Sequence, residues 1–147
     1  MSVTKSKGDL AELQIAADLL RRGFRLAFPY GEDFDFDLIL CRGEALEKVQ
    51  VKYAASDGHV LGVRCESNSL TNGRVIERKQ YTDKTIDWLA VYGATAERCY
   101  CIPARLLGDG RTRIHLRLSP PRNAQRRKIH LNADYTAPTL PVTESCT

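Results

Sequence analysis

The N-terminal part of the chain has the periodicity of an amphipathic helix. Apolar side chains recur with helical spacing at Leu10, Leu13, Ala17 and Leu20. Ser6 and Asp9 have the S-x-x-D spacing of a capping box, which predicts that the helix begins near Ser6. Gly23 is predicted to end it, since glycine is the usual residue after the last helical turn.

The hydrophobic pattern then changes to that of short strands. Strands are predicted over residues 25–29, 34–40, 47–53, 59–65, 86–92, 98–102 and 113–118. A tight turn around Gly43 and Glu44 is expected to join the second and third of these as a hairpin. Pro103 favours a helical turn directly after it. One helix followed by a mostly antiparallel mixed sheet predicts an α/β or α+β fold.

Length and composition indicate one ordinary globular domain. The chain has 147 residues, of which 43% are hydrophobic. We expect the domain to cover residues 1–135, with a loose tail at residues 136–147 that contains two prolines. No apolar run approaches the roughly 18 residues of a membrane-spanning helix. The five cysteines contain no C-x-x-C pair. This pattern is typical of reduced thiols, so we expect a cytoplasmic protein with no membrane association.

Charged side chains lie where the periodicity favours apolar ones. Glu12 shares a helical stripe with Ile15 and Leu19, so its carboxylate is expected at the edge of the core. In the predicted strand over residues 34–40, alternation places Asp35 and Asp37 on the same face.

The predicted hairpin brings more polar groups to this face. Lys48, Gln50 and Lys52 share one face of the strand over residues 47–53. Closing the turn sets Asp37 roughly across from Gln50, where opposed side chains are about 5 Å apart. Asp37, Gln50 and Lys52 are therefore expected to form one cluster.

Two interpretations of this cluster are open. It is either a solvated edge hairpin with cross-strand ion pairs, or a metal-dependent site for phosphoryl transfer. Such a site needs oxygen ligands for Mg²⁺ and a cation near the attacked phosphate. Asp37 and Glu12 would supply carboxylates, Gln50 an amide oxygen and Lys52 an ammonium group. Asp35 is an alternative to Asp37 as the metal-facing acid.

The order of these residues resembles the PD-(D/E)XK nuclease superfamily. Glu12 lies on an early helix, Asp37 lies in Phe-Asp-Leu-Ile-Leu, and Gln50 and Lys52 lie in Val-Gln-Val-Lys. The pattern is similar to that of the small group I intron homing endonucleases, in which glutamine replaces the middle acidic residue. Two departures stand out: Phe36 replaces the proline before Asp37, and Gln50 removes one negative ligand, which favours one metal per site over two.

The resemblance implies a fold and an activity. The fold is a restriction-endonuclease-like mixed sheet flanked by helices. The activity is site-specific hydrolysis of DNA phosphodiester bonds with Mg²⁺, for which Mn²⁺ can substitute. The implied catalytic residues are Glu12, Asp37, Gln50 and Lys52, and the first three of these are the implied metal ligands. Asp37 is preferred over Asp35 because it directly precedes the Leu-Ile-Leu run.

The distribution of charge suits double-stranded DNA as a partner. The net charge is +4, and residues 111–133 contain seven basic residues and no acidic one. Candidates for phosphate contacts are Lys5, Lys7, Arg126, Arg127 and Lys128. Base contacts are expected from residues 64–79, which include Arg74, Arg78 and Lys79 around an Asn-Gly turn; a flexible surface loop is equally compatible with that stretch. One active site cannot cut both strands symmetrically, so a homodimer or homotetramer is expected.

Three other functions are compatible with the sequence. The first is a structure-specific nuclease, such as a Holliday-junction resolvase, on the same scaffold. The second is a DNA-binding protein with an inactive nuclease fold. The third is a general cytoplasmic α/β domain whose basic C-terminal region is only solvated.

Overall fold

The computed structural model describes residues 3–71, 74–108, 111–118 and 130–131, and for residues 3–4, 67–71, 74–79 and 130–131 it describes the backbone alone. Its elements are α1 (Val3–Arg21), β1 (Arg25–Ala27), β2 (Leu38–Arg42), β3 (Ala45–Ala54), β4 (Val60–Arg64), β5 (Glu66–Thr71), β6 (Arg74–Gln80), β7 (Trp88–Gly93), β8 (Arg98–Pro103), a 3-10 helix η1 (Ala104–Leu107), β9 (Arg113–Arg117) and β10 (His130–Leu131). The predicted tail and three phosphate-contact candidates, Arg126, Arg127 and Lys128, lie outside the described residues. The domain boundary at residue 135 therefore stays a prediction.

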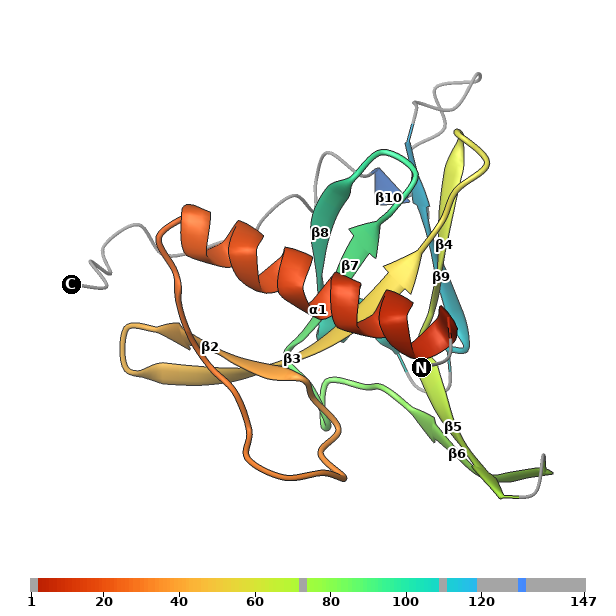
Figure 1. Ribbon diagram of the computed structural model, residues 1–147, viewed down its shortest axis with the longest axis horizontal. Coiled ribbons are helices and arrows are strands. Elements are labelled where there is room, and N and C mark those ends of the chain that lie inside the picture. Colours follow the sequence, from red (N-terminus) through yellow and green to blue (C-terminus); the bar gives the residue numbers. More distant parts are fainter. Residues whose placement is uncertain (1–2, 72–73, 109–110, 119–129, 132–147) are drawn as a thin grey trace.

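The centre of the molecule is a five-stranded mixed sheet with the order β1-β2-β3-β7-β8. The pair β3 and β7 is parallel, and the other neighbouring pairs are antiparallel. Helix α1 lies across one face of this sheet (Figure 1). Its buried residues Ala11, Ile15 and Leu19 pack on apolar side chains of the sheet, including Val49 and Val51 of β3. This packing holds the helix over the strand that contains Gln50 and Lys52.

A second core lies on the other face of the central sheet. Strands β10, β9 and β4 form a three-stranded sheet. Leu61 of β4 and Leu116 of β9 belong to the same buried cluster as Leu89 and Val91 of β7. The layers are thus a helix, a five-stranded sheet and a smaller sheet, an α+β arrangement that agrees with the predicted fold class. Among the described residues, no helix combines the length and the hydropathy needed to cross a membrane.

Strands β5 and β6 form a separate two-stranded ribbon, which projects away from the layers (Figure 1). Their antiparallel register pairs Glu66 with Gln80 at the base and Thr71 with Arg74 near the tip, with an irregularity between Ser69 and Leu70. The sequence was equally compatible with a loop here. The structure shows a ribbon, because backbone pairing over six and seven residues satisfies the polar groups of both segments.

The helix differs from the prediction in its start and in its buried face. It begins at Val3, so Ser6 lies within it and does not cap it. Leu13 and Leu20 of the predicted apolar stripe are 69% and 57% exposed, whereas Ile15 is 1% exposed. Both stripes have helical spacing, but the buried one includes Ala11 and Ala16, whose small side chains let the helix approach the sheet closely. The predicted end is confirmed: Gly23 has φ 91°, and its amide donates to the carbonyl of Leu20.

The predicted strand over residues 34–40 is shorter and later than expected. Strand β2 begins at Leu38, and Phe36 packs against the cluster on the opposite face from the one that holds Leu38 and Leu40. The alternation inferred upstream of Leu38 was therefore wrong, because the chain is not extended there. The hairpin is as predicted: Arg42 pairs with Ala45 across the turn, and Gly43 has φ 58°.

Candidate active site

Asp37 lies directly before β2 and is fixed to β3 at two points. Its amide donates to the carbonyl of Val49, and its Oδ2 accepts a hydrogen bond from the amide of Val51, each at 2.8 Å. The ladder register pairs Leu38 with Val49. The predicted pair of Asp37 with Gln50 lies outside this ladder, and Asp37 instead bonds to the two neighbours of Gln50, Val49 and Val51. The backbone therefore determines where this carboxylate lies.

Glu12 reaches the same region from the helix. It lies beside the buried face of α1, half-buried at the edge of the core as predicted. Glu12 and Asp37 both line a cleft of about 270 Å³. The segment between β1 and β2 forms the rest of its wall, through Phe28, Pro29, Gly31, Glu32, Asp33, Phe34 and Phe36. A helix acid and the acid that precedes β2 thus face one polar cleft.

The two carboxyl groups influence each other electrostatically. Burial and the negative charge of Asp37 raise the pKa of Glu12 above its ordinary value. Burial also raises the pKa of Asp37, while the amide of Val51 and the ammonium of Lys52 oppose this rise. The site is therefore short of positive charge when both acids are ionised. A divalent cation between them would relieve that shortage.

Lys52 is a half-buried residue of β3, two positions after Gln50. Its Nζ lies 3.4 Å from the carbonyl oxygen of Glu66 and 5.1 Å from the centroid of the Tyr81 ring. Burial and the charge of Arg64 lower the pKa of Lys52, and Asp37 acts in the opposite direction. The structure thus brings the predicted lysine within electrostatic reach of the predicted acid.

Among the described residues, Gln50 is the one polar residue in the buried core, with 9% of its surface exposed. Its Nε2 donates to the carbonyl oxygen of Val51 at 3.3 Å. The amide oxygen is the end of this side chain that can serve as a metal ligand. Gln50 is next in sequence to Val51, which binds Asp37, but it is not among the residues that line the cleft with Glu12 and Asp37.

These donors fit a hard divalent cation. Within the part of the chain that the structure describes, no three side chains of the types His, Cys, Asp and Glu form a metal-binding group. The carboxylates of Glu12 and Asp37 line the cleft, and the amide oxygen of Gln50 is the predicted third donor. Magnesium is usually bound through one or two carboxylates and keeps several waters, so this set suits Mg²⁺ better than a fully enclosed metal site.

The other candidates lie further out. Asp35 is half-buried but is not among the residues that line the cleft with Glu12. Lys5 and Lys7 are exposed near the start of α1, and the Nζ of Lys7 lies 5.4 Å from the centroid of the Tyr53 ring. The remaining described candidates, Arg74, Arg78 and Lys79, are residues of β6 on the ribbon.

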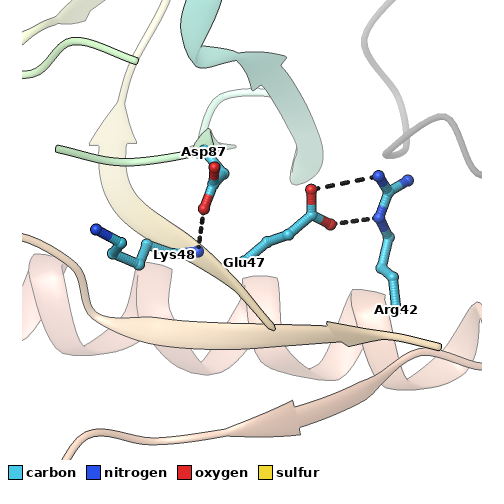
Figure 2. Close-up of polar contacts among 4 residues, drawn as sticks. All are labelled: Arg42, Glu47, Lys48 and Asp87. Atoms are coloured by element: carbon cyan, nitrogen blue, oxygen red, sulfur yellow. Dashed lines mark hydrogen bonds and ion pairs between the residues drawn. The ribbon is translucent and has the colours of Figure 1, made fainter. Parts of the chain in front are cut away.

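A second set of polar contacts stabilises the outer part of the β2–β3 hairpin (Figure 2). Arg42 and Glu47 form a two-contact ion pair across the strands, and the guanidinium of Arg42 lies 5.6 Å from the centroid of the Trp88 ring. Asp87 accepts a hydrogen bond from the amide of Lys48 at 2.8 Å and joins β3 to the start of β7. These contacts fix the strand that leads to Gln50.

Sequence reasoning missed two groups beside Lys52. The carbonyl of Glu66 and the ring of Tyr81 lie at the base of the ribbon, where the chain enters β5 and leaves β6. They are 14 and 29 positions after the lysine in the sequence. No periodicity links positions so far apart. Recognising β5 and β6 as a hairpin would have placed Glu66 near residue 80, and this was the available signal.

Comparison with known proteins identifies the family. The model of the PD-(D/E)XK endonuclease family matches residues 2–138. The chain belongs to the PD-(D/E)XK endonuclease family. Among solved structures, the bacterial homing endonuclease I-Ssp6803I is similar to this endonuclease, with 24% sequence identity and a TM-score of 0.71 over 86% of each chain. No curated protein sequence matches this chain significantly.

Family membership confirms the central predictions from the sequence. The fold is restriction-endonuclease-like, and the protein is an endonuclease that hydrolyses DNA. Members of the PD-(D/E)XK endonuclease family use divalent metal ions. The structural likeness to I-Ssp6803I supports the fold.

Proposed function

We propose that this endonuclease cuts double-stranded DNA site-specifically, in the manner of a homing endonuclease, at a site formed by Glu12, Asp37, Gln50 and Lys52. The observation that carries the proposal is the hydrogen bond between Asp37 and the amide of Val51. It fixes the acid beside the strand positions of Gln50 and Lys52. The cleft that Asp37 shares with Glu12 adds the helix carboxylate.

The division of roles follows from the chemistry of these side chains. Glu12, Asp37 and Gln50 would hold Mg²⁺, or Mn²⁺ in its place. A bound divalent ion supplies a Lewis acid that polarises a phosphate oxygen and lowers the pKa of water. The ammonium of Lys52 stabilises the negative charge that develops on the pentavalent phosphate. Glu12 accepts a hydrogen bond from the attacking water on the helix side.

The ribbon supports recognition of a duplex. A two-stranded β-ribbon fits the major groove, where base edges are distinguishable. Arg74, Arg78 and Lys79 lie on β6, and arginine and lysine are the residues that most often contact guanine. Lys5 and Lys7, at the start of α1, would contact phosphates. The same role is proposed for Arg126, Arg127 and Lys128.

Two further proposals concern assembly and location. Cleavage of both strands at one site requires two active sites, so we propose a homodimer or homotetramer. We also propose that the enzyme acts in the cytoplasm. Four cysteines of the described chain, Cys41, Cys65, Cys99 and Cys101, are unpaired thiols, which suits a reducing compartment.

The activity is tested by plasmid cleavage with Mg²⁺ for the wild type, Lys52→Ala and Lys48→Ala. Lys48 is the matched control, because it lies on the same strand and is exposed. Loss of Lys52 is expected to slow cleavage at least about 100-fold, as for other groups that stabilise transition-state charge. Lys48→Ala is expected to leave the rate nearly unchanged. Equal rates in Lys52→Ala and the wild type would remove Lys52 from the site.

Site specificity is tested separately. The wild type is incubated with genomic DNA and Mg²⁺, and the cut ends are sequenced. Recurrent cuts at one long sequence support a homing-type enzyme. Cuts scattered over unrelated sequences contradict site specificity, and preferential cutting of four-way junctions in a parallel assay supports a resolvase instead.

A further inference from the structure

The ammonium of Lys52 lies at the base of the ribbon. It contacts the residue that begins β5 and the residue that follows β6. Glu66 begins β5 and accepts from Nζ through its backbone carbonyl, at 3.4 Å. Tyr81 directly follows β6 and presents its ring 5.1 Å from the same nitrogen. The register of the ribbon pairs Glu66 with Gln80, the neighbour of Tyr81. The two contacts therefore come from adjacent points of one small structure.

The backbone around Tyr81 is well anchored. Its amide donates to the carbonyl of Cys65 at 2.8 Å, and the amide of Cys65 donates to the carbonyl of Thr112 at 2.9 Å. Tyr81 is 5% exposed and belongs to the core cluster between the two sheets. The ring is thus part of the rigid body of the protein, although the residues before it lead out to the ribbon.

The ring supplies what a half-buried ammonium lacks. Burial of Lys52 removes hydrogen bonds from its ammonium group to water. The hydrogen bond from Nζ to the carbonyl oxygen of Glu66 is long, at 3.4 Å. The face of an aromatic ring carries negative potential and attracts a cation within about 6 Å. An aliphatic side chain of similar size would fill the core equally well but would not attract the ammonium. The contact with the Tyr81 ring is therefore an attraction that acts on Nζ in addition to the hydrogen bond to Glu66.

We propose that Tyr81 is a positioning residue for catalysis: its ring holds the ammonium of Lys52 at the place where the scissile phosphate reacts. This inference rests on the proposed function, because it assumes that Lys52 stabilises the reacting phosphate. Tyr81 acts through Lys52 and does not itself touch DNA. It also joins the ribbon, which is proposed to contact bases, to the lysine that is proposed to promote cleavage.

The test compares Tyr81→Phe, which keeps the ring, with Tyr81→Leu and Tyr81→Met, which remove it. Single-turnover cleavage is measured with enzyme in excess and Mg²⁺ saturating, and DNA affinity is measured without divalent metal. The two aliphatic variants are expected to cleave at least about tenfold more slowly with affinity unchanged. Tyr81→Phe is expected to cleave nearly as fast as the wild type. Ile114→Val, in the same core cluster, is the control for lost packing and is expected to cleave normally.

A second readout follows the contact itself. The ring should shift the proton resonances of the Lys52 ε-methylene upfield in the wild type and in Tyr81→Phe, and this shift should disappear in the aliphatic variants. Wild-type rates in folded Tyr81→Leu or Tyr81→Met overturn the inference and leave the proposed function intact. A wild-type enzyme that cuts no DNA overturns the proposed function, whatever the resonances show. If both aliphatic variants unfold, a slow Tyr81→Phe with an unchanged shift also counts against the inference.

Discussion

The carboxylate of Asp37 accepts a 2.8 Å hydrogen bond from the backbone amide of Val51, the residue that separates Gln50 from Lys52. The link joins the residue before β2 to the middle of β3. Since the donor is a backbone group, the position of the acid does not depend on either neighbouring side chain. Substitutions at Gln50 and Lys52 can therefore change the charge of the site without moving Asp37.

Asp37→Asn separates the charge of this acid from its structural role. Asparagine can still accept the amide of Val51, so the fold is expected to persist with an unchanged circular dichroism spectrum. Loss of the negative ligand should lower Mg²⁺-dependent cleavage at least about 100-fold. Asp35→Asn is the control for the other acid of the same segment and should cleave normally. The reverse result, with Asp35→Asn inactive, would make Asp35 the metal ligand.

Gln50→Glu adds a third carboxylate to the site. Gln50 is buried, so the new charge should destabilise the metal-free protein. The added negative ligand should also tighten metal binding, and Mg²⁺ should then raise the melting temperature more than in the wild type. Gln14→Glu makes the same chemical change on α1, at a residue whose carbonyl contacts Cys99 of β8 and which is not bonded to a neighbour of Asp37. Thermal melts with and without Mg²⁺ measure how far the metal raises the melting temperature of each variant. An equal rise in both variants would exclude Gln50 as a ligand.

The candidate site was predictable because its spacing is local. Asp37, Gln50 and Lys52 lie within one hairpin, and a two-residue turn fixes the register of a hairpin once the turn is located. Glu12 could be placed near the core because three buried neighbours share its helical stripe. The short interval between Asp37 and Lys52 made their proximity accessible without the rest of the fold, whereas the roles of the four residues stay predictions.

The features that escaped prediction depend on distant parts of the chain. The helix has two apolar stripes of similar hydrophobicity, and the sheet that selects Ile15 over Leu13 is built from strands that extend from Arg25 to Pro103. Phe36 lies on the opposite face of the sheet from Leu38 and Leu40, because it packs against the second core, which is formed largely by β4 and β7 to β9. The Tyr81 ring reaches Lys52 only because the ribbon closes at its base. Tertiary packing decides each of these, and local pattern does not.

Alanine substitutions on α1 test which face is buried. Ile15 is 1% exposed and Leu13 is 69% exposed, and both are large aliphatic side chains on the same helix. Ile15→Ala is expected to lower the free energy of unfolding by about 2–5 kcal/mol. Leu13→Ala should change it by no more than about 0.5 kcal/mol. Urea denaturation followed by circular dichroism measures both, and a similar loss in the two variants would contradict the observed helix face.

The raised pKa values of Glu12 and Asp37 predict how the metal-free protein responds to pH. In the range from the ordinary carboxyl pKa values up to the raised ones, the native state binds more protons at these groups than the unfolded state. The free energy of unfolding must therefore fall as the pH rises through that range. The double variant Glu12→Gln, Asp37→Asn removes both groups and should show a flatter profile and higher stability at neutral pH.

Asp57 provides a control of opposite sign. Hydrogen bonds from the amides of His59 and Val60 lower the pKa of Asp57. The ionised Asp57 therefore stabilises the native state above the ordinary carboxyl pKa, and this stabilisation is lost as the pH falls through the lowered pKa. Asp57→Asn should therefore lose stability at neutral pH, where the double variant at Glu12 and Asp37 gains it. Melting temperatures measured in EDTA from pH 4 to pH 8 give both profiles. Mg²⁺ at neutral pH should stabilise the wild type but not the double variant, because only the wild type has the paired carboxylates that a divalent ion neutralises.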